Sequence, residues 1–367
     1  MTAARIYLDH AATTPMLPAA RAAMIEGFGR WANPSSPHRE GRAARAALEE
    51  ARARIRAALG WRHDLIFTSG ATESAAIALH RQARARPLLV SAVEHAAVLR
   101  QRADAIIAPV DESGLVEPAA FGALMRAHPQ PLVAIQHANS ETGILQKIGE
   151  IVEVVDAAGG LLFVDCAQTA GKLPLPPADL IAISAHKFGG PPGIGALLVR
   201  DIGTLAPLGG GQERGYRAGT ENMPAILGFA AALDPALGGA QPPWLLEQID
   251  WRLFLDHAVG QAGGMPVGGP LLDGAARTPT IAAYRLPGLS AEAQLIRLDA
   301  EGFAVSAGSA CSSGSLHASH VLRAMGLGEG EAREVIRVSF GWSTTHAEVE
   351  AFAAAYGRMA QGVARAA

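Results

Sequence analysis

Lys187 is the residue whose type and setting point most directly to chemistry. The chain of 367 residues contains only three lysines, and this one stands between the apolar run Leu180 to Ile183 and a pair of glycines. The apolar run is typical of a buried strand, and the Gly-Gly-Pro-Pro-Gly segment after it predicts an irregular turn. Lys187 is therefore expected near a strand end, where α/β proteins place their ligands.

The neighbours of Lys187 decide between two interpretations of this lysine. An isolated lysine is usually a solvated surface charge, but Ser184 and His186 indicate a polar cluster on a short turn. In such a cluster, burial or a neighbouring cation can lower the pKa of the amine. A neutral amine can form a Schiff base with an aldehyde cofactor.

A second candidate site is an anion-binding turn in the segment Leu65-Ile-Phe-Thr-Ser-Gly-Ala-Thr-Glu-Ser. The pattern predicts a strand, a glycine turn and a new helix, whose free backbone N–H groups and the hydroxyl of Thr72 can bind a phosphate. A capping box that pairs Ser69 or Thr72 with a downstream acid is the structural alternative, and both can hold at once. The chain has neither a Walker pattern nor Gly-x-Gly-x-x-Gly, so a nucleotide is the less favoured ligand.

Asp165 and His95 also follow strand-like runs. Asp165 ends the run Leu161 to Val164, and an aspartate there can keep a heteroaromatic nitrogen protonated, which makes pyridoxal phosphate an electron sink. Strand-end aspartates also often cap the next turn. His95 offers an aromatic face and a nitrogen that titrates near neutral pH, although a lone histidine is more often structural.

Composition sets limits on the class of protein. The net charge is −3 and the arginines are dispersed, so nothing indicates a nucleic-acid or membrane surface. The two cysteines, Cys166 and Cys311, lie far apart, which argues against a disulfide framework and a Cys-x-x-Cys zinc site. The amino terminus turns polar too early for a signal peptide, so we expect a cytoplasmic protein. No resident metal is expected either, because the histidines of Leu316-His-Ala-Ser-His have no third ligand.

Apolar strand-like runs alternate with helical stretches through the first two thirds of the chain. They predict an α/β fold with a mainly parallel sheet covered by helices, followed by a smaller carboxyl-terminal α+β domain. The expected divisions are residues 1–12, which pack with the small domain, a large domain of residues 13–240, and a small domain of residues 241–367. The six runs begin at Leu65, Pro87, Leu132, Leu161, Leu180 and Gly195.

Seven short motifs occur in the order in which cysteine desulfurases carry them. They are Ala71-Thr-Glu-Ser, Glu94-His, His137-Ala-Asn139-Ser-Glu-Thr-Gly, Val164-Asp-Cys-Ala-Gln168, Ser184-Ala-His-Lys187, Arg217-Ala-Gly-Thr220 and Gly308-Ser-Ala-Cys311. From about Ile6 to about Glu348 the chain resembles the NifS/IscS-type members of the class V aminotransferase group. The resemblance implies a pyridoxal-phosphate enzyme of fold type I.

The resemblance also implies roles in cofactor binding. Lys187 would form the Schiff base, Asp165 would contact the pyridine nitrogen, Gln168 the phenolic oxygen, and His95 would stack on the ring. Further residues complete the expected set: Thr72, Ser184 and His186 at the phosphate, Thr220 from the partner subunit of a homodimer with a shared active site, and also Ala71 and Asn139.

Substrate and sulfur chemistry follow from the same resemblance. Asn139 and Arg337 resemble the anchors of the substrate carboxylate, with Asn33 nearby, and an arginine suits this task through bidentate pairing. Cys311 would attack the sulfur of the L-cysteine adduct, so that alanine is released and a persulfide remains. Its surroundings, Ser-Ala-Gly-Ser-Ala-Cys-Ser-Ser-Gly-Ser, predict an exposed loop, whereas Cys166 follows a buried strand and is expected to behave as a small hydrophobe.

The expected catalytic residues are thus Lys187, Cys311 and His95, and the expected product is sulfur for iron–sulfur clusters, thio-cofactors or thiolated tRNA, passed to an unidentified acceptor protein. Alternatives within the fold are a selenocysteine lyase, a cysteine sulfinate desulfinase or an aminotransferase. A non-catalytic binding protein of the same fold is a further alternative. Two departures from the family pattern, Ala75-Ala76 in place of asparagine and Cys166 in place of alanine, lie near the expected pocket.

Overall fold

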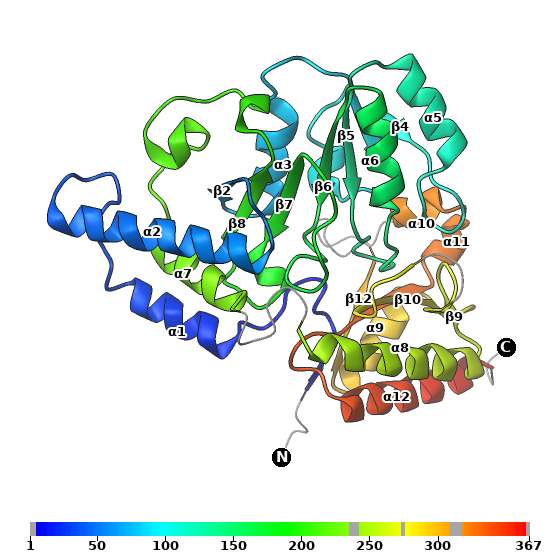
Figure 1. Ribbon diagram of the computed structural model, residues 1–367. Coiled ribbons are helices and arrows are strands. Elements are labelled where there is room, and N and C mark those ends of the chain that lie inside the picture. Colours follow the sequence, from blue (N-terminus) through cyan, green and yellow to red (C-terminus); the bar gives the residue numbers. More distant parts are fainter. Residues whose placement is uncertain (1–4, 235–241, 273–275, 309–317, 365–367) are drawn as a thin grey trace.

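A seven-stranded mixed sheet forms the larger part of the molecule (Figure 1). The computed structural model describes residues 5–234, 242–272, 276–308 and 318–364. In spatial order the strands are β2 (Asp64–Thr68), β8 (Gly195–Val199), β7 (Leu180–Ser184), β6 (Leu161–Asp165), β5 (Leu132–Gln136), β3 (Leu88–Ser91) and β4 (Ile106–Ala108). All neighbours pair in parallel except β8, which is antiparallel to both β2 and β7. The predicted α/β class with a mainly parallel mixed sheet is confirmed.

Helices cover both faces of this sheet, because alternate side chains of its strands point to opposite sides. Leu162 and Val164 belong to one buried cluster with apolar residues of α2, α5, α6 and α7, while Phe163 belongs to another with residues of α3 and α4. The helices of this part are α1 (Pro18–Gly27), α2 (Arg39–Ala58), α3 (Ala71–His80), α4 (Ala96–Leu99), α5 (Pro118–Ala127), α6 (Ile148–Ala157) and α7 (Met223–Ala232), with the 3₁₀ turns η1 (Ala185–Lys187), η2 (Ile202–Thr204) and η3 (Gln212–Gly215).

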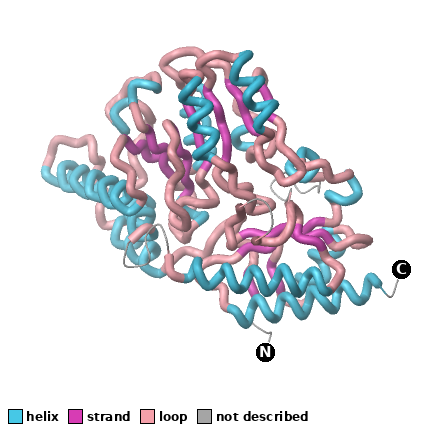
Figure 2. Tube along the Cα trace, turned by 45° about the vertical axis from the view of Figure 1, so that its right-hand side comes forward, coloured by secondary structure: helices cyan, strands magenta, loops and turns pink. Residues whose placement is uncertain are grey.

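A smaller antiparallel sheet forms the remainder. Its order is β12 (Ser306–Ala307), β13 (Val335–Ser339), β10 (Ile281–Arg285) and β9 (Met265–Pro266). Figure 2 shows the long helices α8 (Trp244–Gln261) and α12 (His346–Ala364) running side by side against it. The other helices here are α9 (Ala291–Ala300), α10 (His320–Ala324) and α11 (Glu329–Ala332).

The amino-terminal segment joins the two parts. Strand β1 (Ile6–Tyr7) pairs in parallel with β11 (Phe303–Ala304), and Leu8 lies in the buried cluster of the small sheet. Residues immediately after Leu8 then cross to η1 in the larger part, where Thr14 donates its backbone N–H to the carbonyl of His186 over 2.8 Å. This crossing brings the small sheet and the carboxyl ends of the large sheet together. The exact domain boundaries stay a prediction.

Candidate functional site

A cavity of about 520 Å³ lies at the carboxyl ends of the large sheet. Strands β3, β5, β6 and β7 run parallel, so the residues that follow them meet at one edge, as expected for ligand sites in such sheets. Among the predicted site residues, Ala71, Thr72, His95, Asp165, Gln168, Ser184, His186, Lys187 and Arg337 line this cavity.

Lys187 ends the 3₁₀ turn that follows β7, as its position after a buried run predicts. Its amine Nζ donates hydrogen bonds to the backbone carbonyls of Ala11 (2.6 Å) and Ala12 (2.9 Å). Thr14 donates its hydroxyl to the carbonyl of Lys187 over 3.0 Å. The amino-terminal segment therefore holds both the backbone and the amine of Lys187 at the cavity wall.

The anion-binding turn between β2 and α3 depends on two glycines. Gly70 precedes α3 with a φ of 152°, and a Cβ atom on Gly195 of β8 would lie 2.7 Å from the Cα of Gly70. Only glycines permit this approach of two backbones. The free N–H groups at the start of α3 consequently lie on the cavity wall together with Thr72 and Ser184.

Glu73 stabilises the same turn, so the capping alternative and the anion-binding interpretation coexist. Its carboxylate accepts the backbone N–H of Ser69 and, over 3.0 Å, the Nε–H of Arg217. Burial raises the pKa of Glu73, but the hydrogen bonds from Ser69 and Arg217 outweigh this effect and lower the pKa below its usual value. Glu73 is therefore a carboxylate at neutral pH.

Asp165 and Gln168 line the cavity at the end of β6 and just after it. Burial raises the pKa of Asp165, while the backbone N–H of Ala167 (2.8 Å) and the charges of His95 and Lys187 offset part of this rise. Gln168 donates its amide to the carbonyl of Ala11 over 3.0 Å. Its Oε1 atom is buried without a hydrogen-bond partner among the described residues, so it can accept a hydrogen bond from a bound ligand.

Desolvation keeps two imidazoles of the cavity neutral. The pKa of His95 is lowered chiefly by desolvation and further by Lys187 and His320, although Asp165 acts in the opposite direction. Its Nδ1 accepts the N–H of Ala97 over 3.1 Å, which leaves the proton of the neutral ring on Nε2. The pKa of His186 is lowered to about 4, first by burial and then by neighbouring lysines.

Arg337 enters the cavity from β13 of the small sheet. Its guanidinium donates to the carbonyl of Ser140 over 2.9 Å and to the carboxylate of Asp9 over 2.7 Å. The Nε atom of Arg337 is buried and has no hydrogen-bond partner within the described part of the chain. A buried cation with unused donor capacity suits the binding of an anionic ligand.

Asn139 and Asn33 do not line the cavity, although both were expected near the ligand. The side chain of Asn139 is buried and orders its own turn: Oδ1 accepts the N–H groups of Glu141 and Thr142, and Nδ2 donates to the carbonyl of Val93. Asn33 is exposed and accepts the N–H of Ser35 over 2.9 Å. The roles of both in binding stay predictions.

Thr220 is exposed and does not line the cavity of its own chain, and its contribution to a partner subunit stays a prediction. Cys311 falls in residues 309–317, outside the described residues. Cys166 is fully buried, and burial raises the pKa of its thiol, as expected for a cysteine that packs as a small hydrophobe.

Sequence reasoning missed two buried bases beside the site. Lys172 is 2% exposed, and burial together with the charge of Lys187 lowers the pKa of its amine to about 7. His10 is 1% exposed, and burial followed by the charge of Lys172 lowers its pKa to about 3. The scarcity of lysine and the short spacing from Gln168 to Lys172 were the available signals.

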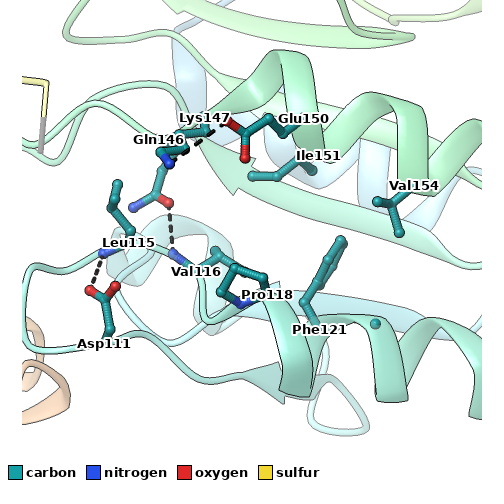
Figure 3. Close-up of a pocket in the computed structure, with 11 residues that line it drawn as sticks. Asp111, Leu115, Val116, Pro118, Phe121, Gln146, Lys147, Glu150, Ile151 and Val154 are labelled. Carbon is teal, nitrogen blue, oxygen red and sulfur yellow. Dashed lines mark hydrogen bonds and ion pairs between the residues drawn. The ribbon is translucent and has the colours of Figure 1, made fainter.

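A second cavity, of about 190 Å³, lies between α5 and α6 (Figure 3). Its walls are mainly apolar, including Phe121, Ile151 and Val154, with Lys147 and Glu150 at its edge. None of the predicted site residues that the structure describes lines it. The larger cavity, which nine of the predicted site residues line, is therefore the candidate site.

His, Cys, Asp and Glu side chains within the described ranges nowhere gather in groups of three or more that could hold a metal ion. Among the described helices, none combines the length and apolar character needed to cross a membrane.

Comparisons with known proteins agree with the geometry. The family model of class V aminotransferases matches residues 6–352. A cysteine desulfurase of Cereibacter sphaeroides is 37% identical, over 94% of this chain and 93% of its own length. An IscS-like cysteine desulfurase of Mycobacterium tuberculosis is 35% identical over the same shares. The chain therefore belongs to the class V aminotransferase family and, within it, to the cysteine desulfurases, which confirms the resemblance inferred from the motifs.

Solved structures support the same assignment. A NifS-like protein from Rickettsia africae aligns with a TM-score of 0.87 at 30% identity, over 97% of this chain and 99% of that one. SspA, solved in complex with cysteine, aligns with a TM-score of 0.76 at 30% identity, over 91% and 98%. The predicted fold of pyridoxal-phosphate enzymes of type I is thereby confirmed.

Proposed function

We propose that this protein is a pyridoxal-phosphate-dependent cysteine desulfurase that converts L-cysteine to L-alanine and leaves the sulfur on Cys311 as a persulfide. The observation that carries the proposal is the position of Lys187 in one cavity with Asp165 and Arg337. The reaction is balanced without an external oxidant: the carbon–sulfur bond of cysteine breaks, a sulfur–sulfur bond forms at Cys311, and a proton replaces sulfur on the substrate carbon.

The residues of the cavity fit pyridoxal phosphate. The start of α3 with Thr72 and Ser184 offers N–H and hydroxyl groups to a phosphate. The unpartnered Oε1 of Gln168 can accept a hydrogen bond from a phenolic hydroxyl, and His95 lines the wall as a flat neutral ring. The bound cofactor supplies an aldehyde that joins to amines and a ring that withdraws electrons from the substrate.

Three residues are proposed to act on protons and charge. Asp165, whose pKa is raised by burial, would hold the ring nitrogen and keep a proton on it. Lys187 would hold the cofactor through Nζ, and its amine can carry a proton at the same atom. Arg337 binds the substrate carboxylate and orients the amino acid, since Asp9 and Ser140 fix its guanidinium.

A homodimer with shared active sites is part of the proposal. Thr220 is exposed and does not line the cavity of its own chain, as expected of a residue that serves a partner's phosphate site. Large apolar side chains are exposed on and just after α1, at Ile25 (61%), Phe28 (66%) and Trp31 (80%), which is typical of an interaction surface. We further propose a cytoplasmic location and delivery of the sulfur to a separate acceptor protein.

The test is alanine formation from L-cysteine by the cofactor-loaded protein, with a reductant present to release the sulfur. Cys311→Ala is expected to abolish alanine formation and to retain the cofactor spectrum. Cys166→Ala is the matched control, because it removes the other thiol and is expected to stay active. Equal alanine formation by the Cys311→Ala variant and the unaltered enzyme would contradict the proposal and favour a lyase.

A further inference from the structure

Glu141 occupies a fixed place next to the active site. It belongs to the loop after β5, and its backbone N–H is held by the side chain of Asn139 over 2.9 Å. The preceding residue, Ser140, lines the cavity, and its carbonyl accepts a hydrogen bond from Arg337. Glu141 itself is 7% exposed. The loop that contacts Arg337, the proposed substrate anchor, therefore also holds the carboxyl group of Glu141 in a fixed position.

One carboxylate oxygen of Glu141 contacts two residues that are distant in sequence. Ser319 donates its hydroxyl to Oε2 over 2.6 Å. Gly308 packs against the same oxygen so closely that a Cβ atom at position 308 would overlap it. In the sequence, Gly308 directly precedes residues 309–318 and Ser319 directly follows them. Cys311 belongs to this stretch, three positions after Gly308.

Ser319 and His320 extend this connection into α10. The hydroxyl of Ser319 caps the helix by accepting the N–H groups of Val321 (3.1 Å) and Leu322 (3.2 Å). His320 donates its Nε2–H to the carbonyl of Glu94 over 2.8 Å. Glu94 directly precedes His95 in the chain. The beginning of α10 is thus attached at Glu141 and at Glu94, which are the chain neighbours of the cavity-lining residues Ser140 and His95.

The contact depends on an oxygen acceptor and not on a full negative charge. Burial raises the pKa of Glu141, and the hydrogen bond from Ser319 and the charges of His320 and Arg337 offset part of the rise. A protonated carboxyl or a glutamine amide also presents an oxygen that can accept the hydroxyl of Ser319. A glutamine at position 141 should therefore keep the hydrogen bond with Ser319, whereas an alanine should lose it.

We propose that Glu141 is a positioning residue for sulfur transfer, which holds Gly308 and Ser319 and so fixes both ends of the segment bearing Cys311 against the loop beside Arg337. The inference rests on the proposed function of Cys311 as sulfur acceptor. Glu141 acts through these contacts and does not touch the reacting atoms.

The experiment compares kcat and KM for L-cysteine, the cofactor spectrum and the thermal midpoint in the full-length, cofactor-loaded protein. Glu141→Ala is expected to lower kcat by about 10- to 100-fold, the cost of a displacement of about 1 Å at a reacting group, with KM and cofactor content unchanged. Glu141→Gln is expected to retain most of kcat. This separation of kcat from KM and rescue by glutamine would not arise from a general structural defect.

Two serine variants form a matched pair. They test the same contact even if Glu141→Ala does not fold. Ser290 caps α9 by accepting the N–H of Ala293, so Ser290→Ala removes a helix cap in the same part of the molecule. Ser319→Ala removes a cap and the contact with Glu141. Only Ser319→Ala is expected to lower kcat strongly, while both lower the thermal midpoint.

The inference is overturned if Glu141→Ala keeps kcat within about twofold of wild type, or if Ser319→Ala and Ser290→Ala reduce kcat equally. It is also overturned if kcat falls only in proportion to lost cofactor. Wild-type protein that forms no alanine would instead contradict the proposed function, so the two failures are distinguishable.

Discussion

Arg337 and Asp9 form an ion pair of 2.7 Å between the small sheet and the amino-terminal segment, and Arg337 is 4% exposed. Asp9 therefore compensates the buried cation at the cavity wall before an anionic ligand arrives. The pair also explains why residues immediately after β1 belong to the site although they are far from β13 in the sequence.

Replacing Arg337 by lysine tests its role as the carboxylate anchor. Lysine keeps the charge but cannot reproduce the planar donor geometry, so KM for L-cysteine is expected to rise by about 10- to 100-fold. Arg333→Lys is the matched control, because Arg333 forms an exposed pair with Glu329. Steady-state kinetics at varied cysteine concentration measures the change, and a KM within twofold of wild type for Arg337→Lys would exclude this role.

Replacing Lys187 by alanine tests the covalent attachment of the cofactor. The variant is expected to lose the visible absorption of the attached cofactor and at least about a thousandfold in kcat, since no other amine is held at that position. Lys147→Ala removes a lysine with an exposed side chain and should change neither property. Retention of the absorption band by Lys187→Ala would show that another residue carries the cofactor.

The ion pair between Arg52 and Glu213 is expected to stabilise the segment that leads to Thr220. Glu213 has a side chain 1% exposed, accepts two hydrogen bonds of 2.8 Å from Arg52 and also accepts the N–H of Phe67. It adopts a φ of 44°, a strained left-handed conformation that these contacts must maintain. Glu213→Ala leaves Arg52 without its buried partner and should lower the free energy of unfolding by about 3 to 5 kcal/mol.

Glu49 supplies the control for this measurement, because it contacts the same arginine from a side chain that is 46% exposed. Glu49→Ala should cost less than about 1 kcal/mol. Urea unfolding of both variants measures the difference. If both variants lost the same free energy of unfolding, the buried pair would not stabilise the protein more than the exposed one.

The pH dependence of stability tests the neutral state of His186. Its folded pKa of about 4 lies below the unfolded value of about 6.5, so the unfolded state binds more protons between these values. The stability contributed by neutral His186 is therefore fully present above about pH 6.5 and is lost as the pH falls toward 4.

The comparison uses urea unfolding of the cofactor-free protein at several pH values, with the variants His186→Gln and His63→Gln. Subtracting His186→Gln from wild type isolates this imidazole from the buried carboxyls, which titrate in both proteins. The difference should decline below pH 6.5. His63→Gln replaces a histidine at an exposed position and is the reference for the substitution itself. A difference for His186→Gln that stays constant over this pH range would contradict the assignment.

Much of the large sheet could be predicted because its strands are short, continuous apolar runs. All six predicted runs are strands, and the position of Lys187, Asp165 and His95 after three of them follows from chain order and parallel pairing. Strand β4 was missed because Ile106-Ile-Ala is too short to show a period.

The remaining features of the site depend on contacts between residues far apart in the chain. Glu141 and Ser319 are 178 positions apart, so no local pattern indicates their hydrogen bond. The burial of Lys172 and His10 likewise results from packing between separate segments. For Asn139 the reason is local. Its side-chain oxygen accepts backbone N–H groups of its own turn, and these hydrogen bonds compete with binding of a ligand.

The most direct test of the account is mass spectrometry of the cofactor-loaded protein after brief mixing with L-cysteine in the absence of reductant. The account predicts that the peptide containing Cys311 gains the mass of one sulfur atom, that Cys166 stays unmodified, and that one alanine forms per persulfide. Alanine formed in the first turnover without added sulfur on Cys311 would contradict it.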